Sequence, residues 1–110
     1  MSSFDVLKKS GEFSYTIKNG LVFYHNLVVV YILENNSPLR FGICVGKKIG
    51  NAVKRNRIKR IFKEILRSML SFFKFNGAVV IIARASCKSA DFNEIKESFF
   101  SVFKESGIIY

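Results

Sequence analysis

The segment from Lys47 to Arg67 carries half of the lysines and arginines of the chain and most of its net charge. It reads KKIGNAVKRNRIKRIFKEILR and contains nine lysines and arginines but a single acid, Glu64. It therefore holds +8 of the formal net charge of +10 that the 110 residues carry at pH 7. A run of cations this unbalanced repels itself unless a polyanion lies against it, so the chemistry that it predicts is phosphate binding.

Three details of this segment favour phosphate binding over a merely solvated surface. Arginines alternate with an asparagine at 55–57, and a guanidinium group offers a planar fork that binds phosphate at two points. Gly46 and Gly50 come just before the expected helix, where free backbone amides and the helix dipole attract anions. A face that only keeps a protein in solution usually mixes charges of both signs, and here Glu64 is the single acid.

No arrangement of side chains in the sequence predicts a catalytic centre made of protein. The carboxylates are not paired, and Cys44 and Cys87 match no metal-ligand spacing, so we expect both to be small buried residues in a reducing compartment. His25, the single histidine, is expected in a loop or at the surface rather than as a ligand or base. If the protein serves a reaction, we expect that it does not perform the chemistry itself.

One helix, from about Asn51 to Leu70, should carry the basic side chains. At about 100° per residue, apolar side chains form one stripe and cations occupy the other side. The predicted stripe is Ile58, Ile61, Phe62, Ile65 and Met69, and the predicted polar side is Asn56, Lys59, Arg60, Lys63 and Arg67, flanked by Arg55 and Arg57. We expect the stripe to pack on a sheet, which leaves no free apolar face for binding a membrane.

The N-terminal half should supply one helix and two or three strands. We predict a helix over 10–19, capped by Ser10 and stopped by a left-handed conformation at Asn19-Gly20. Strands are predicted over 27–33 and 39–45, joined through the turn at 34–38 as an antiparallel hairpin, and the pattern is compatible with a further short strand near 21–23.

The C-terminal part should supply a buried strand over 78–83 and a helix. Asp91 and Glu94 form a capping-box pattern at the start of that helix. Five apolar side chains then recur at helical spacing and are expected in the core: Phe92, Ile95, Phe99, Val102 and Phe103.

Length and composition fit one α+β domain that spans residues 1–110. Hydrophobic residues make up 49% of the chain, which is too many for a disordered protein. The element order α-β-β-(β)-α-β-α predicts a sandwich of helices on a small central sheet. No apolar run approaches the roughly 20 residues of a bilayer span, and no signal-peptide-like stretch follows Lys8 and Lys9, so we expect a cytoplasmic protein.

The stretch from Lys48 to Arg60 resembles the signature of the bacterial ribonuclease P protein component. That family's pattern is K-x-G-x-A-V-x-R-N-x-x-K-R, and every specified position is met by KIGNAVKRNRIKR. The resemblance extends over nearly the whole chain, because 10–20 is similar to the family's E-x-F…G helix and the IIAR run ends at Arg84 as it does in the family.

The resemblance implies a subunit of a ribonucleoprotein endoribonuclease. Family members bind a catalytic RNA, their obligate partner, and with it remove the 5′ leader from precursor tRNA. The RNA and its Mg²⁺ perform the chemistry, no other protein is required, and the protein binds the leader and broadens tolerance of substrate and of Mg²⁺. The implied fold, shared with a ribosomal protein domain, contains a left-handed β-α-β crossover, although about 98% of such crossovers are right-handed.

The resemblance also implies two sets of site residues. Contacts to ribonuclease P RNA fall on Lys47, Lys48, Asn51, Arg55, Asn56, Arg57, Lys59, Arg60, Lys63 and Arg67. The precursor-tRNA leader is expected in a cleft between the first helix and the sheet, at Phe13, Ile17 and Tyr31. From the sequence alone, Phe13 and Tyr31 are more often core residues than stacking platforms, and they line one surface only if the helix packs across the sheet.

Three positions depart from the family pattern. Ile17 stands where an aromatic residue is common, Gly46 where serine is frequent, and Lys63 where arginine is common, so Lys63 keeps the charge and loses the fork.

Three other functions compete with this reading. A stand-alone RNA-binding protein, such as an α/β-type ribosomal protein, fits the charge and the fold class. A nuclease that acts alone with its own metal is disfavoured because the sequence has no carboxylate cluster. Double-stranded DNA binding lacks a helix-turn-helix, zinc or heptad pattern.

Overall fold

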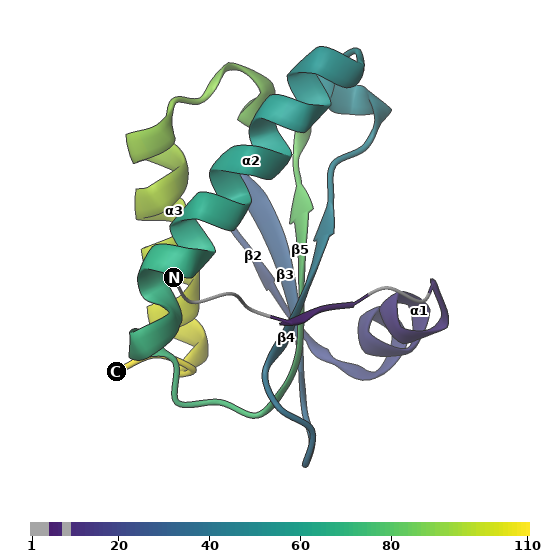
Figure 1. Cartoon of the computed structure of the whole chain (residues 1–110), viewed down its shortest axis with the longest axis vertical. Coiled ribbons are helices and arrows are strands. Elements are labelled where there is room, and N and C mark those ends of the chain that lie inside the picture. Colours follow the sequence, from purple (N-terminus) through teal and green to yellow (C-terminus); the bar gives the residue numbers. More distant parts are fainter. Residues whose placement is uncertain (1–4, 8–9) are drawn as a thin grey trace.

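The structure, a computed structural model, describes residues 5–7 and 10–110 of the chain (Figure 1). Three helices, five strands and three short 3₁₀ turns occur in this part. In chain order they are β1 (Asp5–Val6), α1 (Ser10–Asn19), β2 (Leu21–Tyr24), β3 (Val28–Glu34), β4 (Arg40–Cys44), η1 (Lys47–Ile49), α2 (Ala52–Met69), η2 (Leu70–Phe72), β5 (Gly77–Ala83), η3 (Ala85–Ser89) and α3 (Phe92–Ser106). The α+β class and the element order are confirmed, and β1 is an addition that no pattern indicated.

The five strands form one mixed sheet in the order β1-β4-β5-β3-β2. The hairpin predicted between 27–33 and 39–45 is wrong, because β5 lies between β3 and β4 and pairs antiparallel with β3 and parallel with β4. β5 is the most apolar strand, with Val79, Val80 and Ile81 fully buried, and the centre of the sheet buries both of its faces. The turn between β3 and β4 is long enough to pass the end of β5, since two strands with one strand between them lie roughly 10 Å apart.

The connection from β4 through α2 to β5 is a left-handed crossover. In Figure 1 the two parallel strands run upward with β4 in front of β5, and α2 returns downward on the left. This path turns anticlockwise as it recedes from the viewer, which is the hand that the resemblance implied.

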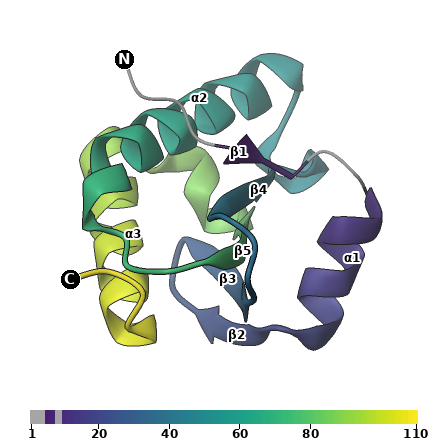
Figure 2. The same ribbon diagram turned by 60° about the horizontal axis from the view of Figure 1, so that its bottom comes forward.

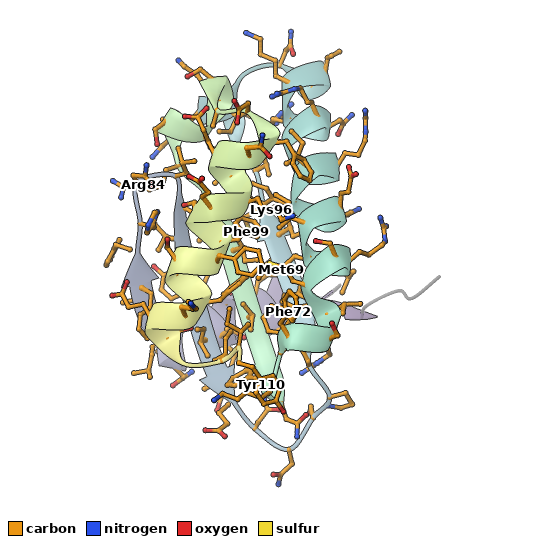
Figure 3. The ribbon with its side chains drawn as sticks, turned by 90° about the vertical axis from the view of Figure 1, so that its left-hand side faces the viewer. Met69, Phe72, Arg84, Lys96, Phe99 and Tyr110 are labelled. Atoms are coloured by element: carbon orange, nitrogen blue, oxygen red, sulfur yellow. The ribbon has the colours of Figure 1, made fainter. Side chains whose placement is uncertain are left out.

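One face of the sheet is covered by α2 and α3. Figure 3 shows Met69 and Phe99 between the two helices. Phe62 packs edge-on against Phe99, with ring centroids 4.9 Å apart, and Phe99 packs in turn against Phe103 at 5.7 Å. The phenylalanines predicted for the core are therefore confirmed there, with Phe92 half-buried at the margin.

The other face of the sheet is covered only in part, by α1 (Figure 2). A small cluster of Leu7, Ala78 and Val80 is buried beneath this helix, and Phe13 and Tyr31 pack against it. The Phe13 ring lies directly on Gly42, where a β-carbon would come within 2.6 Å of the ring. Gly42 thus permits the close approach of α1 to β4.

The ends of the helices use different devices. The capping box at Asp91 and Glu94 is confirmed by two reciprocal hydrogen bonds of 2.8 and 3.0 Å. The left-handed stop predicted at Asn19-Gly20 is wrong, since neither residue has a positive φ. Gly20 is required for space instead, because a β-carbon there would lie 2.7 Å from the Thr16 carbonyl oxygen and 2.8 Å from that of Ile32. The cap predicted at Ser10 depends on a side chain outside the described part of the chain.

None of the helices in the described ranges is both long enough and apolar enough to cross a membrane.

Candidate nucleic-acid interface

The basic segment enters α2 through a tight turn. The η1 turn buries Ile49, which anchors it to the core and leaves Lys47 and Lys48 exposed. Gly50 adopts φ +136°, a conformation that side chains other than glycine rarely take. The Asn51 side chain then accepts a 3.0 Å hydrogen bond from the Lys54 backbone N–H, so it caps the helix. Because the Asn51 side-chain oxygen caps the helix, the side-chain NH2 group is the part left free of this bond for the predicted RNA contact.

The buried stripe of α2 is turned slightly from the predicted one. Ile58, Phe62, Ile65, Leu66 and Met69 are fully buried, whereas Ile61 is half-buried. Lys59 lies seven residues before Leu66 and therefore on nearly the same side of the helix. This explains why Lys59 is half-buried rather than fully exposed, as the predicted polar side required.

The remaining predicted contacts on α2 form an exposed surface. Asn56, Arg57, Arg60, Lys63 and Arg67 are all exposed, while Arg55 is half-buried at the first turn of the helix. The structure thus brings the ten predicted RNA-contacting residues onto the continuous segment from η1 through α2, with Arg55 and Lys59 less exposed than the others.

The cations of this segment form no ion pair with any acid in the described part of the chain. Among the residues that the structure describes, the only ion pair joins Arg40 to Glu12, with Nη1 and Oε2 3.0 Å apart. It links β4 to α1 and involves none of the nine lysines and arginines of 47–67. Their mutual repulsion is therefore offset only by the single charge of Glu64 within the segment, and such an excess of cations favours binding of a polyanion.

The structure brings Phe13 and Tyr31 together and leaves Ile17 at the rim. Phe13 and Tyr31 are both half-buried against the same small cluster under α1. Ile17 follows on the same helix and is 36% exposed. These three side chains therefore mark the boundary between α1 and the open part of the sheet face.

Sequence reasoning missed a second row of side chains on this face. Strand register aligns Tyr24 with Val29, Val29 with Ile82, and Ile82 with Cys44, so their side chains cross four strands in a line. The neighbouring row, which contains Tyr31 and Gly42, is the one that Phe13 covers. The only signal in the sequence was the alternation within each strand, and aligning four strands requires the register.

The row borders a pocket of about 420 Å³ with basic walls. Tyr24, Val29 and Ile82 line it, together with Lys48 from η1 and Arg84 from the end of β5. It therefore joins the basic segment to the open face of the sheet.

The two cysteines lie in different surroundings. Cys87 is fully buried, and this burial raises the pKa of its thiol to about 11, with nearby Arg57 opposing the rise. Cys44 is only half-buried, and burial raises the pKa of its thiol while Lys59 opposes the rise. The prediction of buried cysteines is thus correct for Cys87 and only partly correct for Cys44.

The histidine has a partner that the sequence did not reveal. His25 follows β2 in a turn, as predicted for a loop residue, and is half-buried. Its Nδ1 lies 2.6 Å from the hydroxyl oxygen of the buried Ser98 on α3. Because Ser98 is buried, this pair is a structural contact between the turn and α3.

A helix of unpaired cations beside a half-open, aromatic-lined sheet face defines a nucleic-acid-binding protein of the single-strand or structured-RNA type. Comparison with known proteins specifies which one. The family model described as Ribonuclease P matches residues 1–107, and the chain belongs to this family. It is therefore the RNA-binding subunit of a ribonucleoprotein that matures the 5′ end of tRNA, with catalysis carried out by the RNA.

Individual relatives agree over almost the full length of the chain. The ribonuclease P protein component of Alkaliphilus metalliredigens is 34% identical and aligns over 99% of each chain. That of Clostridioides difficile is 39% identical over 93% of this chain and 91% of its own. The RNase P protein structure from Staphylococcus aureus superposes with a TM-score of 0.88 at 32% identity, covering 96% and 97% of the two chains. The Thermotoga maritima structure gives 0.83 at 26% identity, covering 92% and 96%.

Proposed function

We propose that the two surfaces of this subunit bind two different RNAs. The exposed cations of η1 and α2 bind the sugar-phosphate backbone of ribonuclease P RNA, and the half-open face beside α1 binds the 5′ leader of precursor tRNA. The observation that carries the first assignment is the set of nine lysines and arginines with no acidic partner in the described chain. The α2 arginines add geometry to charge, since each guanidinium can bind one phosphate at two points.

The second assignment is supported by the aromatic groups on the sheet. Phe13 and Tyr31 present half-buried rings at the edge of α1, and Ile17 adds an apolar wall. Unpaired bases stack on such rings, whereas a folded tRNA body has few bases free to do so. A single-stranded leader is therefore the ligand that this face fits.

The position of the protein between two polyanions suggests how it assists the reaction. Leader and catalytic RNA repel each other, and the cations between them screen this repulsion. Precursor affinity should rise and the requirement for Mg²⁺ should fall when the protein is present. Cleavage by the RNA alone and by the holoenzyme, measured across Mg²⁺ concentrations, tests this, and an unchanged Mg²⁺ requirement contradicts it.

The test of the first surface is the substitution Arg60→Glu. Placing like charge against a phosphate should weaken assembly with ribonuclease P RNA by about 1–3 kcal/mol, measured as a binding curve at moderate salt. Lys104→Glu makes a matched control, because it gives the same change of charge on the exposed face of α3. Equal binding by the two variants would remove Arg60 from the interface.

The test of the second surface is Tyr31→Ala. Losing a stacked base should cost the holoenzyme about 1–3 kcal/mol of affinity for leader-bearing precursor, with little loss for mature tRNA. If both substrates lose equally, Tyr31 serves only to pack the face beneath α1.

Co-purification separates this function from the alternative of a ribosomal protein. The tagged chain should recover a catalytic RNA of ribonuclease P type from its own cells. Recovery of ribosomal subunits instead would support the alternative.

A further inference from the structure

We propose that Tyr24 forms a second base-stacking site for the leader, beyond the contacts proposed at Phe13, Ile17 and Tyr31. Arg84 would contact a leader phosphate there, and so would Lys48, which lies where this site borders the surface proposed for ribonuclease P RNA. This inference rests on the proposed leader function and extends it to the uncovered row of the sheet. Tyr24 lies outside the signature from Lys48 to Arg60, and we expect one base of the leader to stack on its ring.

The first support is the exposure of the Tyr24 ring on the correct face. Tyr24 is 66% exposed although it belongs to a strand, and it lies two residues from Val22, which pairs with Tyr31. Alternate residues of a strand share a face, so Tyr24 and Tyr31 lie on the same side of the sheet. A single-stranded chain that leaves the α1 cleft along the strands reaches Tyr24 next.

The second support is the apolar floor beside the ring. Val29 and Ile82 are half-buried, line the pocket of about 420 Å³ and continue the row from Tyr24 toward β4. A base stacked on Tyr24 would cover them, which removes apolar surface from water. The volume lies within the range of small-ligand sites.

The third support is the charge around the pocket. Lys48 and Arg84 are exposed, line the pocket and have no acidic partner in the described chain. Stacking surface with cations on its walls is the arrangement that binds single strands.

The fourth support is the rigidity of the turn that follows Tyr24. The Arg84 side chain donates a 2.9 Å hydrogen bond to the His25 carbonyl oxygen, and the Arg84 backbone N–H donates one of 2.9 Å to Leu27. Ser86 donates to the Asn26 carbonyl oxygen at 2.5 Å. The turn after β2 is therefore held against η3, so that the ring is positioned before a base arrives.

A fluorescent reporter gives the direct test. The chain has no tryptophan, so Tyr24→Trp introduces a single emitter at the proposed site. In the reconstituted holoenzyme, adding leader-bearing precursor tRNA should quench this emission, and adding mature tRNA should not. The matched control is Tyr15→Trp, because Tyr15 is similarly exposed, at 63%, on α1. Quenching of both reporters, or of neither, overturns the proposal.

Affinity measurements complete the test. Tyr24→Ala should weaken precursor binding by the holoenzyme about 5- to 100-fold, and Tyr24→Phe, which keeps the ring, should bind nearly as the wild type does. When the base that stacks on Tyr24 is removed by an abasic nucleotide, Tyr24→Ala should no longer weaken precursor binding. The leader position at which this occurs should differ from the position at which an abasic nucleotide removes the effect of Tyr31→Ala. Equal loss for precursor and mature tRNA overturns the proposal.

The two alanine variants distinguish failure of the second stacking site from failure of the proposed leader function. If Tyr31→Ala reduces the preference for leader and Tyr24→Ala does not, the leader function stands and the second stacking site is refuted. If neither variant reduces that preference, the leader function falls and the second site falls with it.

Discussion

The two faces of the sheet differ in how completely they are covered. On one face, α2 and α3 bury a continuous layer of phenylalanine, isoleucine and leucine. On the other face, α1 covers one row of side chains and leaves the row of Tyr24, Val29 and Ile82 partly open. The first face can supply most of the stability, and this leaves aromatic and apolar surface of the second face available for the proposed leader contact. Stability and recognition should therefore respond to different substitutions.

Removing a large side chain from the covered face should have the largest effect. Phe62 is fully buried and packs on Phe99, so Phe62→Ala should lower the free energy of unfolding by about 3–5 kcal/mol. Val29→Ala on the open face should cost only about 1 kcal/mol, because that side chain is half-buried. Urea denaturation of both variants measures the contrast, and similar losses would remove the distinction between the faces.

Cys87, which is buried in the core on the covered face, should make the stability of that face depend on pH. The pKa of Cys87 is about 11 in the folded protein and about 9 when its thiol is exposed, so the unfolded chain loses this proton first as pH rises. The resulting stability is fully present below about pH 9 and declines by at most about 3 kcal/mol as pH rises to about 11. The difference between wild type and Cys87→Ala in urea denaturation, taken from pH 8 to 11, isolates this contribution from other titrating groups. A constant difference would contradict it.

Alanine substitutions at Gly42, which is packed under α1, and at Gly11, which faces open space, should change stability in opposite directions. Gly42→Ala would place a β-carbon 2.6 Å from the Phe13 ring, so the ring must shift, at a cost of about 1–3 kcal/mol in unfolding free energy and a loss of leader affinity. Gly11→Ala on α1 meets nothing within 4 Å and should stabilise the helix by about 0.5–1 kcal/mol. Thermal denaturation should show shifts of opposite sign for the two variants, and a neutral Gly42→Ala would mean that α1 is not seated as described.

The smallest expected effect belongs to the ion pair between α1 and β4. Glu12 and Arg40 are both partly exposed, so Glu12→Gln should change the free energy of unfolding by no more than about 1 kcal/mol. We expect it to leave leader affinity nearly unchanged, because Phe13 and its cluster seat α1. Precursor binding by the holoenzyme measures this, and a large loss would show that the ion pair positions the cleft.

Local signals in the sequence predicted the parts of the fold that depend on neighbours along the chain. The capping box at Asp91 and Glu94, the stripe on α3 and the two sides of α2 all follow from spacing within one helix. The omission of Leu66 from the predicted stripe is a difference of a few tens of degrees, and it is enough to explain the half-buried Lys59.

Strand pairing could not be predicted in the same way. The turn at 34–38 favours a hairpin of β3 and β4 locally. The most buried strand, β5, follows some 40 residues later and takes the central position between them, and no local signal indicates this. The hand of the crossover was implied by the family resemblance alone. The row through Tyr24, Val29 and Ile82 depends on the register of four strands, and so it was not visible from the sequence.

Two surfaces of this one small protein are proposed to bind two different RNAs. Photo-crosslinking from a benzophenone side chain, placed at Arg60 in one variant and at Ile17 in another, tests it in the holoenzyme bound to precursor tRNA. We predict that the probe at Arg60 attaches to ribonuclease P RNA and the probe at Ile17 to the 5′ leader. Attachment of both probes to the same RNA would show that the two surfaces do not bind different RNAs.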